Sequence, residues 1–174
     1  MGLRWNALPL TRFHVVQEFP LRLHHNTPGW VRSGSVFHIR IRVSPTQNIP
    51  LTKPTLAADL LKSVQLYHDS QKWWCKLFLL MPDHLHALLA FPRESGMSAT
   101  IREWKRGAAR IQGVQWQDNY FDHRVRSAKL EGEVWNYIRR NPAVKGLCPN
   151  DDLWAYWWSG VQQRIEGNAL HLDP

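Results

Sequence analysis

Apolar and polar residues follow two different periods along this sequence. Four stretches show the alternation or the short apolar run that predicts a β-strand, namely residues 36–43, 73–80, 84–91 and 120–126. Three stretches repeat apolar residues every three or four positions and so predict amphipathic helices, namely residues 55–70, 97–111 and 129–141. Ser98 is the expected N-cap of the second helix, and Pro142 is expected to end the third directly after Asn141.

The order of these elements is strand, helix, strand, strand, helix, strand, followed by one more helix. This order predicts an α+β fold of the ferredoxin-like (split βαβ) type, an antiparallel sheet with helices on one face and an extra C-terminal helix. In this topology the first and third strands are central neighbours. The polar residues of both strands would then share the open face of the sheet, and they are His38, Arg40, Arg42, His84 and His86.

Three segments are expected along the chain: an irregular extension at residues 1–35, one domain at 36–147, and a tryptophan-rich tail at 148–174. The 174 residues are enough for one domain with a buried core. The two cysteines provide neither a disulfide framework nor a zinc ligand set, and no apolar run is long enough to span a membrane. We therefore expect a soluble, intracellular protein without a membrane partner.

Basic residues outnumber acidic ones, with 22 Lys and Arg against 14 Asp and Glu and a net charge of +8. Arginine supplies most of this excess, and its planar guanidinium group suits the oxygens of phosphate. The balance therefore favours a polyanionic partner, with nucleic acid as the leading candidate. The alternative is a basic protein that has no such partner.

Two pairs of residues could carry chemistry. His84 and His86 alternate on a strand, so both imidazoles face the same way and could bind a divalent cation. They could equally be two satisfied polar residues on a half-exposed strand. Tyr137 and Asn141 lie one helical turn apart on one helix face. Taken alone, the tyrosine could pack in the core while the asparagine ends the helix.

Together, these four residues are the parts needed to break a phosphodiester through a protein-linked intermediate. A metal ion held by His84, His86 and the side-chain oxygen of Asn141 would polarise the phosphate, and Tyr137 would attack phosphorus. A phenol ionises near pH 10, so the cation would also have to help the tyrosine lose its proton. Mixed nitrogen and oxygen ligands with open positions favour Mg²⁺ or Mn²⁺ over a closed zinc site.

Several motifs resemble one known family. They read HIRIR at residues 38–42, MPDHLH at 81–86, WQ at 116–117, FDHRVR at 121–126, YIRRNP at 137–142 and KGL at 145–147. At these residues the chain resembles the single-tyrosine HUH transposases related to the IS200/IS605 group, and more closely the REP-associated tyrosine transposases. The resemblance spans about residues 22–158, and the combination of the His-x-His strand with the Tyr-Ile-x-x-Asn-Pro element makes it specific.

The resemblance implies that His84, His86 and Asn141 bind the metal and that Tyr137 is the nucleophile, which forms a 5′-phosphotyrosine and frees a 3′-hydroxyl. It implies single-stranded DNA with hairpins as substrate, strand transfer without ATP, and a cytoplasmic, nucleoid-associated bacterial protein that acts as a monomer or homodimer. The residues expected to contact DNA are His38, Arg40, Arg42, Lys105, Arg106, Arg124, Arg126, Arg139 and Arg140. The alternative is a domesticated relative that binds single-stranded DNA or RNA on the same fold without cutting it.

Overall fold

The computed structural model describes residues 33–161, so most of the expected N-terminal extension and the last residues of the expected tail lie outside it. The strands are β1 (Val36–Arg42), β2 (Trp74–Leu80), β3 (His84–Ala90), β4 (Phe121–Val125) and β5 (Trp157–Trp158). The helices are α1 (Pro54–Asp69), α2 (Met97–Gln112), α3 (Ala128–Val144) and the short 3-10 helix η1 (Asp151–Leu153). None of the helices in this range is long and apolar enough to cross a membrane.

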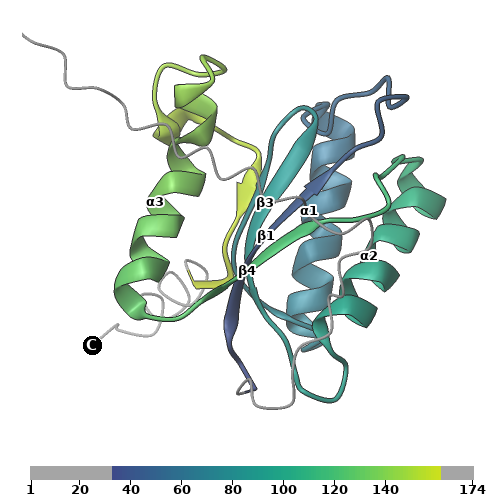
Figure 1. Cartoon of the computed structure of the whole chain (residues 1–174). Coiled ribbons are helices and arrows are strands. Elements are labelled where there is room, and N and C mark those ends of the chain that lie inside the picture. The colour runs from purple at the N-terminus through teal and green to yellow at the C-terminus, as the bar shows by residue number, and fades with distance from the viewer. Residues whose placement is uncertain (1–32, 162–174) are drawn as a thin grey trace, which may run out of the picture.

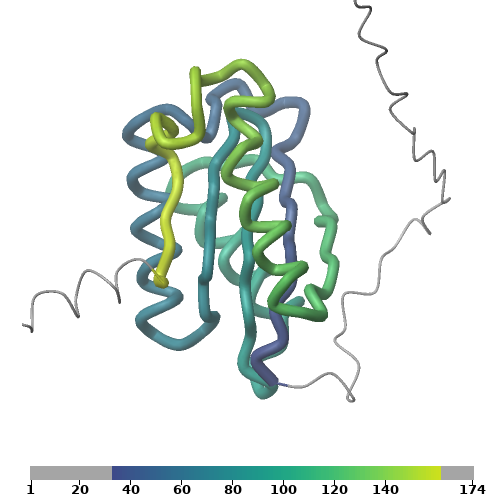
Figure 2. Tube along the Cα trace, turned by 90° about the vertical axis from the view of Figure 1, so that its left-hand side faces the viewer, coloured from purple at the N-terminus to yellow at the C-terminus, as the bar shows by residue number. Residues whose placement is uncertain are grey.

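One antiparallel sheet contains all five strands, in the order β4-β1-β3-β2-β5 (Figures 1 and 2). As predicted, β1 and β3 are neighbours at its centre, with Arg40 opposite His86 and Arg42 opposite His84. Every predicted strand and helix is present, with ends that differ from the expected ones by a few residues. The α+β fold class and the split βαβ strand order are therefore confirmed.

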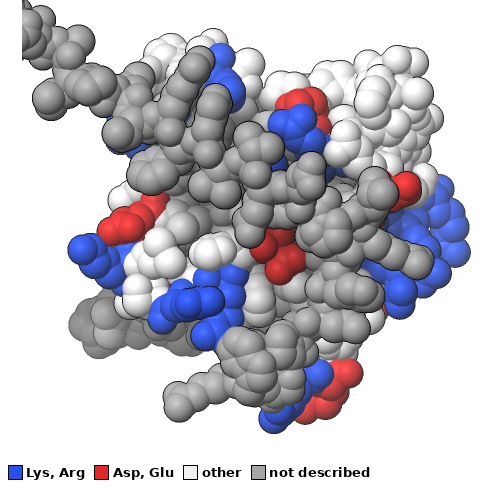
Figure 3. Space-filling view, viewed as in Figure 1, with Lys and Arg blue, Asp and Glu red and all other residues white. Residues whose placement is uncertain are grey.

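Helices α1 and α2 cover one face of the sheet (Figure 1). Alternate residues of each strand face them, such as Ile39 of β1 and Leu85 of β3, and these pack against Leu60 of α1 and Trp104 of α2 in the larger of two cores. The outer side of α2 is basic, and Lys and Arg side chains gather over this helix in Figure 3. The amphipathic pattern of the two helices thus sets which side of each is buried.

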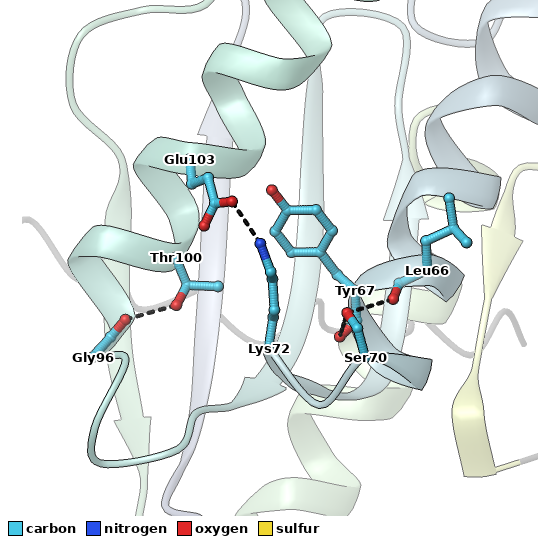
Figure 4. A network of polar contacts seen from close by, with 7 residues as sticks. All are labelled: Leu66, Tyr67, Ser70, Lys72, Gly96, Thr100 and Glu103. Carbon is cyan, nitrogen blue, oxygen red and sulfur yellow. Dashed lines mark hydrogen bonds and ion pairs between the residues drawn. The ribbon is translucent and has the colours of Figure 1, made fainter.

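A polar network links the end of α1 to α2 (Figure 4). Lys72 donates to Glu103 over 2.5 Å, and its ammonium group lies 4.9 Å from the ring centroid of Tyr67. Both charged side chains are exposed to water, which screens their attraction. A part-buried hydrogen bond also joins the two helices, from the indole nitrogen of Trp104 to Ser63 Oγ at 2.9 Å.

Helix α3 lies on the opposite face of the sheet from α1 and α2 (Figures 1 and 2). The prediction that this face stays open is therefore wrong over part of its area. A second core forms there from Leu77 and Leu79 of β2, Leu88 of β3 and Ile138 of α3. The reason is that this face carries Leu77, Leu79 and Leu88 beside its polar residues, and α3 keeps these three side chains from water.

The ends of the helices differ in part from the expected ones. The N-cap of α3 is Ser127, whose hydroxyl accepts the backbone N–H three residues later. The prediction that Pro142 ends α3 is wrong, because the helix continues to Val144. Pro142 lies in the last turn, where its missing N–H costs a single helical hydrogen bond. The N-cap of α2 is Gly96, with φ of 66°, and Ser98 lies inside the helix.

Part of the expected tail packs on the domain. Residues 151–158, called the strap below, contain η1 and end in β5, which pairs with β2 and was not predicted. The indole nitrogen of Trp154 donates to a backbone carbonyl of β2 over 3.0 Å. The guanidinium of Arg139 lies 3.9 Å from the ring centroid of Trp157 and donates to the carbonyl of Asp151 over 2.9 Å. The strap therefore ties α3 to the edge of the sheet.

Replacing Ile138 with alanine should lower the free energy of unfolding by about 2–5 kcal/mol, because the side chain is fully buried between α3 and the sheet. Urea denaturation followed by far-UV circular dichroism measures this change. Val144→Ala on the same helix is the matched control, since that side chain is exposed, and its effect should stay within about 0.5 kcal/mol. Equal denaturation midpoints for the two variants would contradict the packing of α3.

Candidate active site

The four residues predicted to form the catalytic centre come together in one cleft. His84 and His86 of β3 and Tyr137 and Asn141 of α3 all line a cavity of about 390 Å³. The other lining residues are Arg40, Arg42, Met81, Pro82, Asp83, Lys145 and Leu147. Groups that are far apart in sequence meet here because α3 packs on the sheet face that carries the histidines.

The two histidines of β3 place their Nε2 atoms 3.2 Å apart. Both rings are largely buried, and each has a further partner at Nδ1. Asp83 Oδ1 accepts a hydrogen bond from His84 Nδ1 over 2.6 Å, and His38 Nε2 lies 3.0 Å from His86 Nδ1. With both Nδ1 atoms engaged, the Nε2 atoms are the ring nitrogens that can serve a ligand in the cleft.

This arrangement fits a divalent cation. Two ring nitrogens bound at right angles, each about 2.1 Å from a metal ion, are about 3 Å apart. The observed Nε2 separation of 3.2 Å is close to that value. No group of three His, Cys, Asp or Glu side chains within residues 33–161 is placed to hold a metal ion. Asn141, 7% exposed, lines the same cavity, and its side-chain amide offers a neutral oxygen donor there.

Tyr137 is the exposed member of the group, with 55% of its surface accessible. Its ring contacts His86 and His38 edge to face, with centroid distances of 5.9 and 6.2 Å. Its neighbour Ile138 is buried in the second core. Since successive residues of a helix point in different directions, burial of Ile138 places Tyr137 beside the imidazoles and open to solvent. The phenol is thus accessible to a macromolecule.

The histidines of the cleft are held neutral. Burial, with the positive charge of Arg40 adding to it, lowers the pKa of His38 from 6.5 to about 4. Burial and the neighbouring imidazoles lower the pKa of His86 from 6.5 to about 2. Burial also lowers the pKa of His84, against the opposing effect of Asp83. A neutral imidazole keeps the lone pair that a metal ligand requires.

Three cations line the cleft beside these neutral rings. Arg40 is half-buried, with its guanidinium 5.6 Å from the ring centroid of Phe121, and Arg42 and Lys145 are exposed. Arg40 and Arg42 were predicted to contact DNA. Two further lining residues were not predicted, namely Lys145, which follows Asn141 by one helical turn, and Asp83, which directly precedes His84. The closeness of these two residues in sequence to Asn141 and His84 is the feature from which a place in the cleft could have been predicted.

Other residues predicted to contact DNA lie away from the cleft. Lys105 and Arg106 are on α2, across the sheet from the histidines (Figure 1). The ammonium of Lys105 donates to the backbone carbonyls of Gln117 and Asp118 over 2.6 and 3.1 Å, and burial lowers its pKa. Arg124 is opposite Phe37 in the β1–β4 pairing and so shares the face that α1 and α2 cover.

Of the remaining residues predicted to contact DNA, one is half-buried and two are exposed. Arg139 is committed to the strap through Trp157 and Asp151, and burial lowers its pKa. Arg140, on α3, and Arg126, just beyond β4, are exposed. The structure therefore brings together the four predicted catalytic residues but spreads the predicted DNA contacts over several surfaces.

Comparison with known proteins identifies the fold. No protein-family model and no curated protein sequence matches this chain. Its structure is similar to that of a REP-associated tyrosine transposase solved with a bound REP hairpin, with a TM-score of 0.65, 18% identity, and coverage of 85% of this chain and 87% of that one. A candidate transposase of Deinococcus radiodurans R1 also matches, with a TM-score of 0.47, 17% identity, and coverage of 64% of this chain and 93% of that one. The chain therefore has the fold of a REP-associated tyrosine transposase, which agrees with the resemblance seen in the sequence motifs.

Because the folded-state pKa values of His38 and His86 lie below 6.5, the unfolded chain takes up these protons first as the pH falls. We therefore expect the free energy of unfolding, measured with EDTA present, to fall below pH 6.5, by up to about 1.4 kcal/mol per pH unit for each histidine. Urea denaturation at a series of pH values measures this slope. His86→Gln removes one titrating group and should reduce this slope by up to about 1.4 kcal/mol per pH unit, whereas Val144→Ala, at an exposed non-titrating position of α3, should leave the slope unchanged. Identical slopes for the two variants would contradict a neutral His86.

Proposed function

We propose that this protein cleaves single-stranded DNA in a metal-dependent reaction and transfers the strand through a 5′-phosphotyrosine intermediate. The observation that carries this proposal is the meeting of Tyr137 and Asn141 with His84 and His86 in one cleft. The proposal agrees with the fold, which is that of a REP-associated tyrosine transposase. Fold alone does not define a reaction, so the side chains of the cleft carry the argument.

The cation would be held by His84 Nε2, His86 Nε2 and the side-chain oxygen of Asn141. Mg²⁺ or Mn²⁺ suits this mixed set of nitrogen and oxygen donors and would, when bound, polarise the scissile phosphate and favour loss of the phenolic proton. Asp83 holds the His84 ring in place through its 2.6 Å hydrogen bond. A carboxylate behind a ligating imidazole fixes the ring and raises its basicity.

Tyr137 is the nucleophile in this proposal. Its phenolic oxygen attacks phosphorus and loses its proton to water, a bond forms between phosphorus and the tyrosine oxygen, and the bond from phosphorus to the 3′-oxygen breaks. The leaving oxygen takes up a proton and becomes a 3′-hydroxyl, while the 5′-phosphate stays on the protein. Attack by a 3′-hydroxyl on this phosphotyrosine rejoins a strand. One phosphodiester replaces another at each step, so no ATP is needed.

The substrate proposed is single-stranded DNA that carries a hairpin. The REP-associated tyrosine transposase of the same fold was solved with a REP hairpin bound to it. In the present chain, Arg40, Arg42 and Lys145 line the cleft and provide positive charge beside the site where the phosphate would lie. The exposed phenol of Tyr137 leaves space for a strand to approach.

Tyr137→Phe should abolish cleavage of labelled hairpin-bearing single strands in the presence of Mn²⁺, together with the covalent protein–DNA adduct. Only the nucleophilic oxygen is removed, so binding of the same strand should stay within about twofold. Denaturing gel electrophoresis measures the cut strand and the adduct. Tyr156→Phe, a tyrosine that packs beside Trp154, is the matched control and should retain cleavage.

Two results would contradict this mechanism. Cleavage that persists in Tyr137→Phe would exclude this tyrosine as the nucleophile. Binding of the strands by the unmodified protein, with no cleavage under Mg²⁺ or Mn²⁺, would instead favour a protein that binds single strands without cutting them.

The arginines of the cleft should determine the salt dependence of DNA binding. Arg40→Ala and Arg42→Ala should each lower the slope of log K against log salt concentration by roughly 0.7 to 1, because each removes about one phosphate contact. Fluorescence anisotropy with a labelled single strand at several salt concentrations measures the slope. Lys62→Ala, exposed on α1 across the sheet, is the charge-matched control. An unchanged slope in both arginine variants would remove the cleft from the DNA-binding surface.

A further inference from the structure

A third histidine supports the pair in the cleft. His38 comes from β1, diagonally across from His86 in the β1–β3 pairing, and its Nε2 lies 3.0 Å from His86 Nδ1. The two rings are stacked, with centroids 5.3 Å apart and planes at 23°. His38 also contacts the ring of Tyr137 edge to face at 6.2 Å. It therefore touches one proposed metal ligand and the proposed nucleophile.

The hydrogen bond between these rings determines where His86 carries its proton. A neutral imidazole has one N–H, and the other nitrogen holds the lone pair. If both Nε2 atoms of His84 and His86 are to face a cation, each ring must carry its proton on Nδ1. For His84 the acceptor at that position is Asp83 Oδ1, at 2.6 Å. For His86 it is His38 Nε2, which accepts when the proton of His38 is on its own Nδ1.

We infer that His38 is a positioning residue, which accepts a hydrogen bond from His86 Nδ1 and so keeps the Nε2 lone pair of His86 directed at the cation site. This inference rests on the proposed function, since it assumes that a divalent cation binds between the two Nε2 atoms. Each of the two imidazoles of β3 then has its own hydrogen-bond acceptor at Nδ1. Asp83 supports His84 with a charged acceptor, and His38 supports His86 with a neutral one.

The inference replaces the expectation that His38 contacts DNA. The contacts of His38 run to side chains in and beside the cleft, because its Nε2 lies 3.0 Å from His86 Nδ1 and its ring lies edge to face with Phe121 and Tyr137. Its Nε2 atom is engaged with His86 and so is not free for another partner. His38 is half-buried and enclosed by His86, Phe121 and Tyr137. These contacts are those of a residue that positions a metal ligand.

Binding of Mn²⁺ to the DNA-free protein tests the inference without any enzymatic readout. The signal of free Mn²⁺ in electron paramagnetic resonance falls as the ion binds, which yields a dissociation constant. His38→Phe keeps a flat ring but lacks the acceptor, and it should weaken Mn²⁺ binding by about 10- to 100-fold. His38→Gln supplies an amide oxygen as acceptor and should recover much of that loss.

His123→Phe is the matched control for these variants. His123 lies opposite His38 in the β1–β4 pairing, but it is exposed, so the Mn²⁺ dissociation constant should not change. Urea denaturation of each variant shows that it is folded under the conditions of the binding measurement. Recovery by glutamine separates the hydrogen bond from packing, because a purely structural role for the ring would favour phenylalanine.

A second measurement reads the proton directly. Nitrogen-15 spectra of the imidazoles, recorded with diamagnetic Mg²⁺, distinguish a protonated Nδ1 from a protonated Nε2. In the unmodified protein the proton of His86 should be on Nδ1, and in His38→Phe this preference should be lost.

The inference is overturned if His38→Phe binds Mn²⁺ as tightly as the unmodified protein, or if His86 carries its proton on Nε2 while Mg²⁺ is bound. In both cases the proposed function would stand. If the unmodified protein binds neither ion, the cation site of the proposed function fails, and the role of His38 fails with it.

Discussion

The packing of α3 on the second face of the sheet is the interaction on which the rest of the structure depends. Ile138 enters a core built from leucines of β2 and β3, and this contact sets the rotation of the helix. Tyr137, one residue earlier, then lies beside the imidazoles, and Asn141, one turn later, lines the same cavity. The strap fixes the helix at the sheet edge through Arg139. A helix held from two sides can keep a reactive group within a narrow range of positions.

The same packing also sets the electrostatics of the cleft. By covering the histidines, α3 helps to remove them from water, and burial is the main cause of the lowered pKa values of His38 and His86. The lining residues include three cations but a single carboxylate, that of Asp83. A cation bound to neutral ligands in this setting would leave the cleft positive, and a phosphodiester is the partner that balances this charge. In the proposed function, metal ligation and DNA binding would therefore be coupled through charge.

Where the structure departs from the sequence-based predictions, solvent exposure explains the difference. Arg139 was expected to contact DNA, but in the structure it contacts the strap through Asp151 and Trp157, and no periodicity in residues 148–161 indicated that segment. Arg124 alternates onto the face that α1 and α2 cover. The net charge of +8 predicted a polyanionic partner without showing that the cations divide between the cleft and α2, on opposite sides of the sheet.

The sequence by itself determined the elements, their order and the strand pairing, because the alternation of apolar residues and the fixed topology of the split βαβ unit leave few arrangements. From these it follows that Arg40 and Arg42 neighbour His86 and His84. Only the tertiary structure decided which face of the sheet α3 covers. It also decided that Tyr137 is exposed while Asn141 is buried, and that His38 lies within hydrogen-bond distance of His86. These outcomes depend on how two surfaces fit together across many residues, and local periodicity carries no information about that fit.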